Sequence, residues 1–138
     1  MARIMLLLAL LLGTAGMAVA GSYNYVEPDE FRQWLGKGKD VTVVDIQVAD
    51  DYSKHHFYPS LETNAYPVKT SDDKSKLDKI MPLISADRKG VVIVCPRGGG
   101  GAKNTYDYLK EKGIEETRIF ILREGMQGWP YKDLVRAR

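Results

Sequence analysis

Three short, almost purely apolar runs constrain the fold of this 138-residue chain more than any other feature: residues 41–46 (VTVVDI), 91–94 (VVIV) and 118–122 (RIFIL). Apolar runs of this length without alternation are typical of strands buried on both faces of a sheet. The segments between them carry helical patterns, and strands that alternate with helices form parallel sheets through right-handed crossovers. The sequence therefore predicts a three-layer α/β domain with a mainly parallel sheet flanked by helices.

The helical patterns differ in clarity. Residues 28–36 have proline at the start, apolar residues at helical spacing and a glycine at the end, and residues 102–113 end in the same way. In residues 77–84 the apolar side chains also lie on one helical face, although we expect Pro82 to kink or shorten that helix. Residues 69–76 (KTSDDKSK) are interpreted as a polar link.

The first twenty residues have the composition of a secretory signal peptide. A basic residue, Arg3, precedes an apolar run, and small residues end the segment at Ala18-Val19-Ala20. We therefore expect cleavage after Ala20, a single α/β domain at residues 21–138, and a periplasmic or secreted protein. The alternative is an uncleaved membrane anchor, because no charge occurs between Ile4 and Val26.

The charge balance excludes two classes of partner. Of the 20 basic residues only Arg3 lies in the predicted signal peptide, which leaves 19 basic and 18 acidic residues in the remaining domain. A nearly neutral domain has no electrostatic attraction to nucleic acid or to an anionic membrane. We expect neither nucleic-acid binding nor stable membrane association after cleavage.

The single cysteine, Cys95, occurs where a reactive thiol is expected. It follows the apolar run 91–94 and precedes four glycines and a helical segment (VVIVCPRGGGGAK). Ligands of parallel α/β sheets bind beyond the carboxyl ends of the strands. Glycines that adopt positive φ allow successive N–H groups to form an anion-binding nest. The predicted site comprises Cys95 as nucleophile, the loop residues Arg97, Gly98, Gly99, Gly100 and Gly101, and electrostatic support from Lys103.

These surroundings favour the thiolate form of Cys95, because loop amides, a helix N-terminus and two basic side chains stabilise negative charge. One alternative is a cysteine that only fills space behind a glycine-rich turn. Another is a nucleotide-phosphate loop, but the run lacks the G-x-x-x-x-G-K-[ST] spacing and no G-x-G-x-x-G fingerprint is present.

At these residues the chain resembles the rhodanese family of sulfurtransferases, over about residues 26–129. The segment VVIVCPRGGGGAKNTYDYLKEKG is similar to the family's strand, cysteine loop and helix. VVDIQVADDYSKHHF is similar to its D-V-R…E-F-x-x-G-H-I segment, and ILREGMQGW to its L-x-G-G-x-x-x-W ending. The resemblance implies a five-stranded parallel sheet flanked by helices.

The resemblance also implies a reaction without cofactor or metal. Cys95 would take the outer sulfur of thiosulfate or a similar anion as a persulfide and pass it to cyanide, a thiol or a protein acceptor. The first alternative is a sulfur carrier that loads the same persulfide without turning over small donors. A thiol redox protein is less favoured, since no resolving cysteine exists.

The chain departs from the family pattern at three positions. A second basic residue of the loop is replaced by Gly100, the arginine after the acidic strand end by Gln47, and the glutamate before the aromatic by Asp51. A Cys-dependent phosphatase of this fold would need arginine six residues after the cysteine, where Gly101 stands.

The adjacent histidines His55 and His56 lack metal-ligand spacing, and His56 matches the architectural histidine of the family pattern. Asp45, at a buried strand end, is expected to accept backbone hydrogen bonds.

Overall fold

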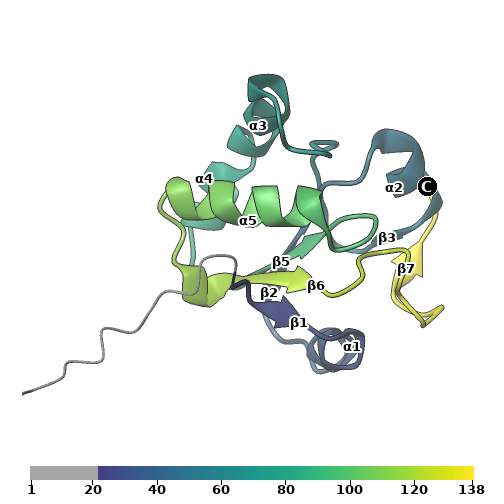
Figure 1. Cartoon of the computed structure of the whole chain (residues 1–138). Helices are drawn as coiled ribbons and strands as arrows, with labels where there is room; N and C mark the ends of the chain where they lie inside the picture. Colours follow the sequence, from purple (N-terminus) through teal and green to yellow (C-terminus); the bar gives the residue numbers. More distant parts are fainter. Residues whose placement is uncertain (1–21) are drawn as a thin grey trace, which may run out of the picture.

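The computed structural model describes residues 22–138, so the predicted signal peptide lies outside the described residues. Its main sheet has five strands, all parallel, in the order β1-β6-β5-β2-β4 (Figure 1). The strands are β1 (Tyr25–Val26), β2 (Val41–Asp45), β4 (Leu61–Glu62), β5 (Gly90–Val94) and β6 (Ile119–Leu122). The predicted five-stranded parallel α/β architecture is confirmed.

The three long strands form the centre of this sheet. In the register of β2 and β5, Val41 pairs with Gly90 and Asp45 with Val94, so both strands end at the same edge. All the apolar side chains of β5 are fully buried. Side chains of this size stabilise a fold by about 1.5–3 kcal/mol each when buried, which explains why the apolar runs predicted these strands correctly.

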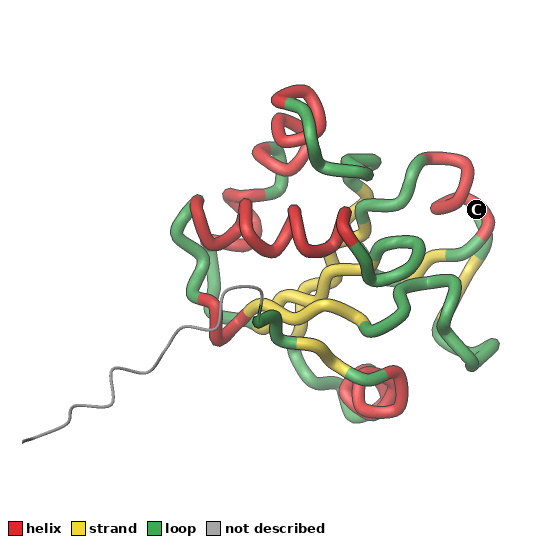
Figure 2. Tube along the Cα trace, in the orientation of Figure 1, coloured by secondary structure: helices red, strands yellow, loops and turns green. Residues whose placement is uncertain are grey.

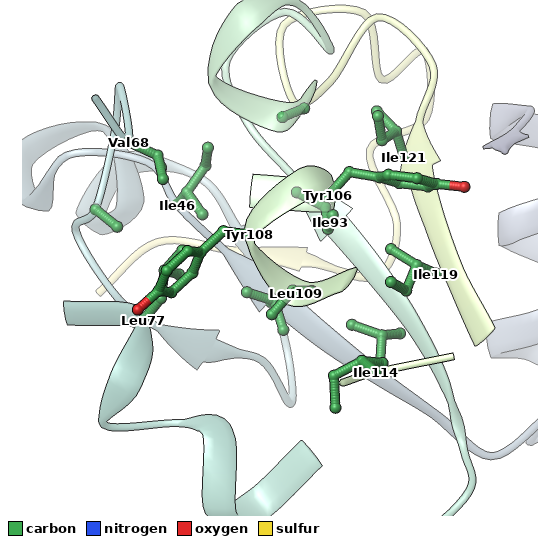
Figure 3. Packing of buried hydrophobic residues seen from close by; sticks show 14 of the residues in the cluster. Ile46, Val68, Leu77, Ile93, Tyr106, Tyr108, Leu109, Ile114, Ile119 and Ile121 are labelled. Carbon is green, nitrogen blue, oxygen red and sulfur yellow. The ribbon is translucent and has the colours of Figure 1, made fainter. Parts of the chain in front are cut away.

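Helices cover the two faces of the sheet unequally. On one face lie α3 (Ser71–Asp78), α4 (Met81–Ser85) and α5 (Gly100–Glu111), and on the other α1 (Pro28–Gly36) (Figures 1 and 2). Leu109 of α5 belongs to the same buried cluster as Ile93 and Ile121 of the sheet (Figure 3). The opposite cluster joins Phe31 of α1 to Phe57 and Val92.

The prediction that residues 69–76 form a polar link is wrong, because this segment contains most of α3. Thr70 begins this helix with a capping box, in which its side chain accepts from the Asp73 N–H and the Asp73 carboxylate accepts from the Thr70 N–H. Pro82 lies in the first turn of the separate helix α4, where a missing N–H costs nothing. The helical pattern over residues 77–84 is therefore divided between the short helices α3 and α4, so the helix is shortened as expected, without a kink at Pro82.

Two short elements lie beside the carboxyl edge of the sheet. Helix α2 (Ala49–Lys54) follows β2, and β3 (His56–Phe57) pairs antiparallel with β7 (Val135–Arg136) near the chain end (Figure 1). The 3₁₀ turn η1 (Glu116–Arg118) leads into β6. Within residues 22–138, every helix is too short or too polar to cross a bilayer.

Candidate active site

Cys95 lies directly after β5, at the carboxyl edge of the sheet, and α5 begins five residues later. Pro96 has no N–H and favours extended backbone at the residue before it, so the strand direction persists up to the cysteine. The residue faces the α5 side of the sheet, in the cluster that also contains Ile93 and Ala102. This is the position that the sequence predicts for the thiol.

The sulfur is buried and hydrogen-bonded. Cys95 is 1% exposed, and the Gly98 N–H donates to its Sγ at 2.7 Å. Burial alone fits a cysteine that fills space, but a backbone N–H directed at the sulfur stabilises negative charge there. The positive end of the α5 dipole acts at the same loop. The contact therefore distinguishes this loop from simple packing.

The four glycines have different roles, which corrects the picture of a continuous nest. Gly98 alone among them has a positive φ, at 71°. Gly99 is the N-cap of α5, and Gly100 and Gly101 form its first turn. The Gly98 conformation turns its N–H back toward the sulfur, whereas the later glycines place the helix N-terminus beside the loop.

A second loop, residues 123–129, holds the cysteine loop from behind. The Met126 N–H donates to the Cys95 carbonyl at 2.8 Å, and the Gln127 N–H donates to the Pro96 carbonyl at 2.9 Å. Gly125 has a φ of 62°, and a Cβ there would overlap the Cys95 carbonyl oxygen and lie 2.7 Å from the Arg97 nitrogen. The two loops are thus in direct backbone contact.

The two basic residues of the predicted site lie apart from each other. Arg97 is exposed, and its Nε donates to the Gln127 side-chain oxygen at 3.2 Å. Lys103 is also exposed, and its Nζ lies 5.8 Å from the centre of the Tyr23 ring. Arg97 is therefore tied to the second loop through Gln127. Lys103 instead lies near Tyr23, whose ring packs on Tyr106 of α5.

The neighbouring strand end carries a buried carboxyl group. Asp45 is fully buried and accepts from the Gln47 backbone N–H at 2.8 Å and from the Gln47 side-chain amide at 3.0 Å. Burial raises the pKa of Asp45 to about 6, and the two hydrogen bonds from Gln47 oppose this rise. The same amide also donates to the His55 carbonyl, so Gln47 ties β2 to the end of α2.

The two histidines do not form a common site. His56 is buried, its ring stacks on Tyr52 with centroids 4.1 Å apart, and its Nδ1 lies 2.8 Å from the Tyr52 carbonyl oxygen. His55 is exposed. These contacts place His56 in the packing of α2 against β3.

Sequence reasoning missed Tyr66, which forms a wall beside the start of α5. Its ring is packed so closely on Gly101 that a Cβ there would lie 2.8 Å from Tyr66 Cδ2 and 3.3 Å from Ile46 Cδ1. The Tyr66 N–H donates to the Ile46 carbonyl, and the residue remains 41% exposed. No periodic pattern marks such a residue; only the absence of a side chain at Gly101 shows where a neighbour could fit.

The comparisons with known proteins agree with this arrangement. Residues 27–132 match the family model described as rhodanese-like domain. The As–Sb reductase of Leishmania major is 19% identical with a TM-score of 0.62, and the match covers 85% of this chain and 87% of that chain. A rhodanese-like domain protein from Staphylococcus aureus is 20% identical with a TM-score of 0.59, covering 83% and 98%.

A yeast protein tyrosine phosphatase of the rhodanese family is 16% identical with a TM-score of 0.63, covering 78% of this chain and 83% of that chain. No curated protein shows significant sequence similarity to the chain. At these identities the structural likeness concerns the fold.

Proposed function

The chain belongs to the rhodanese-like domain family, and we propose that it is a sulfurtransferase that moves a sulfane sulfur through a Cys95 persulfide. The observation that carries the proposal is the Gly98 N–H directed at Cys95 Sγ. A donor of this kind stabilises the thiolate before the reaction and the charge that develops on sulfur during it.

In the loading step, the Cys95 thiolate attacks the outer sulfur of a donor such as thiosulfate. A new S–S bond forms to Sγ, the donor's S–S bond breaks, and its electron pair leaves with sulfite. The Gly98 N–H stabilises the negative charge on Sγ before the attack, and the positive end of the α5 dipole favours the negative charge that moves to the outer sulfur. Since Cys95 is buried, its sulfur has little contact with bulk water.

In the second step a thiophilic acceptor attacks the outer sulfur, and the electron pair of the broken bond returns to Sγ. Cyanide, a small thiol or a protein thiol can serve. Both steps use only the donor, the acceptor and Cys95, so no oxidant, reductant, metal or cofactor enters the proposal.

A phosphatase or reductase function has less support from the site. Gly101 stands six residues after Cys95, where a phosphatase of this kind holds phosphate with arginine, and Tyr66 fills the space beside it. A dithiol redox cycle needs a second cysteine, and Cys95 is the single cysteine of the sequence. The sulfur-carrier alternative uses the same loop and differs only in turnover.

The test is steady-state formation of thiocyanate from thiosulfate and cyanide by residues 21–138, compared with the Cys95→Ser variant. We expect many turnovers by the wild-type domain and none above background by the variant. The two proteins should have the same circular dichroism spectrum and thermal midpoint within a few degrees. Retained transfer by Cys95→Ser contradicts the proposal; loading without turnover favours the carrier.

Export of the protein remains a separate proposal that rests on residues 1–20. Its test is the N-terminal mass of the protein recovered from an expressing cell. We expect a chain that begins at Gly21 in the periplasmic or secreted fraction, and a chain that retains Met1 in the membrane fraction contradicts cleavage.

A further inference from the structure

A groove of about 810 Å³ opens between α2 and the C-terminal segment. We call it the C-terminal groove. The residues of its lining that matter here are Lys54, His55, Gln127, Trp129, Lys132 and Arg136. A volume in this range suits a drug-sized molecule or a short peptide segment.

One side of the C-terminal groove is formed by the C-terminal segment, residues 129–137, and contacts hold this segment at both ends. Near its start, two contacts join it to α1. The Tyr131 hydroxyl donates to the Asp29 carboxylate, and Asp133 forms an ion pair with Arg32 at 3.2 Å. Near its end, β7 pairs with β3, and Arg138 pairs with Glu62 at 2.9 Å. A wall held in this way is formed before a ligand binds, which reduces the entropy cost of binding.

The charges of the C-terminal groove favour an anionic occupant. Lys54, Lys132 and Arg136 line it, against a single acidic side chain, Asp51. Within residues 22–138, none of these four takes part in an ion pair. Clustered cations whose charge is not neutralised by neighbours attract carboxylates and accelerate their association.

The C-terminal groove is also connected to the cysteine loop. Met126 and Gln127 line it, and their N–H groups are the donors to the Cys95 and Pro96 carbonyls. The Gln127 side chain accepts from Arg97. The C-terminal groove therefore borders the loop that supports the backbone of Cys95.

We propose that the C-terminal groove binds an acidic segment of a protein sulfur acceptor and so brings the acceptor's thiol to Cys95. This proposal rests on the proposed function. In the transfer, the acceptor thiolate bonds to the outer persulfide sulfur, the bond from that sulfur to Sγ breaks, and its electron pair returns to Sγ. The acceptor leaves as a persulfide.

The first experiment measures binding without sulfur chemistry. Trp34 and Trp129 are the two tryptophans, so in a Trp34→Phe variant the fluorescence reports on Trp129 in the groove. The probes are a pentapeptide with serine between two pairs of glutamates and its lysine counterpart. We expect saturable binding of the acidic peptide that weakens about fivefold in Lys54→Glu/Lys132→Glu and at high salt.

The matched control is Lys37→Glu/Lys79→Glu, which changes net charge equally on two exposed lysines outside the groove. We expect this control to bind the acidic peptide as the parent does. Equal weakening in both double variants, or equal binding of both peptides, overturns the proposal. Calorimetric titration of the chain with both tryptophans keeps the result independent of the Trp34 substitution.

The second experiment replaces the peptide serine with cysteine and measures sulfur transfer from loaded protein, relative to transfer to cyanide. We expect the acidic peptide to be about fivefold faster than the basic one, with the ratio falling to about one in Lys54→Glu/Lys132→Glu. Transfer to cyanide without peptide preference overturns the groove proposal alone. Binding of the acidic peptide without transfer to any acceptor supports the groove and overturns the proposed function.

Discussion

The loops that follow β5 and β6 leave the same edge of the sheet, and each contains a glycine with left-handed backbone angles, Gly98 at 71° and Gly125 at 62°. In the first loop the Gly98 N–H points to the cysteine sulfur. In the second loop the N–H groups after Gly125 point to the carbonyls of Cys95 and Pro96. One loop carries the sulfur that we propose as the nucleophile, and the other holds the backbone of the first.

This difference separates two ways of losing activity. A change in the cysteine loop can remove a contact to sulfur while the sheet and helices remain folded. A change in the second loop acts through close backbone packing, so activity is lost together with stability. The following substitutions test the distinction.

The largest effect on stability is expected from Gly125→Ala. Its Cβ would overlap the Cys95 carbonyl, and its positive φ adds backbone strain, so we expect a loss of about 3–4 kcal/mol in the free energy of unfolding. Urea unfolding measures it. Gly113→Ala is the control, because Gly113 also has a positive φ but a Cβ there meets nothing within 4 Å. Equal losses in the two variants would show that packing on the cysteine loop is unimportant.

Gly98→Ala should affect activity more than stability. A Cβ there would lie 2.8 Å from the Glu124 nitrogen and 3.0 Å from the Leu122 oxygen, so the loop must shift its N–H away from Sγ. We expect a loss of about 2 kcal/mol in stability and a fall on the order of tenfold or more in kcat/KM. Gly100→Ala, with open space at its Cβ, should leave both nearly unchanged. A fully active Gly98→Ala variant would contradict the role of this N–H.

At the carboxyl end of β2, in contrast to the two loops, we expect a contribution to stability that depends on pH, from Asp45. Because burial raises the pKa of Asp45 to about 6, the folded state holds more protons than the unfolded state between about pH 4 and 6. The contribution of Asp45 to stability therefore falls as pH rises through this window and is constant above it. We expect the stability of Asp45→Asn, relative to wild type, to increase by about 2 kcal/mol between pH 4 and 7. A constant difference contradicts a raised pKa.

The smallest effect is expected from Arg97→Ala. Arg97 is exposed, and within residues 22–138 its side chain forms one hydrogen bond, to the Gln127 side chain, so its removal should cost little stability. If its charge attracts anionic donors, kcat/KM should fall about fivefold for thiosulfate and less for an uncharged donor. Equal losses with both donors would show that Arg97 acts only through the loop.

The sequence predicted the parts of the fold that burial dictates. The strands at residues 41–46, 91–94 and 118–122, the helix at 28–36 and the position of Cys95 at a strand end follow from apolar runs and turn residues. It did not predict α3, because only Leu77 of that helix is buried and no apolar periodicity marks it; the T-x-x-D spacing of Thr70 and Asp73 was the available signal for its start. Nor did it predict β1 and β4, which have two residues each and no pattern to detect.

The candidate site also has a part that the sequence predicted and a part that it did not. The cysteine, its glycines and the following helix are contiguous in sequence, so their chemistry can be inferred together. The contacts of Gly125 with Cys95 and of Tyr66 with Gly101 join distant segments, and they arise from the packing of loops at the sheet edge. Single-sequence patterns contain no signal for such contacts.

The central claim is that Cys95 carries a sulfane sulfur, and the intact mass of residues 21–138 after incubation with thiosulfate tests it most directly. We predict a gain of one sulfur atom, mapped to Cys95, that is lost when cyanide is added, while the Cys95→Ser variant gains none. An unchanged mass with thiosulfate, with polysulfide and with a protein persulfide, or a gain of sulfur by Cys95→Ser, would contradict the account.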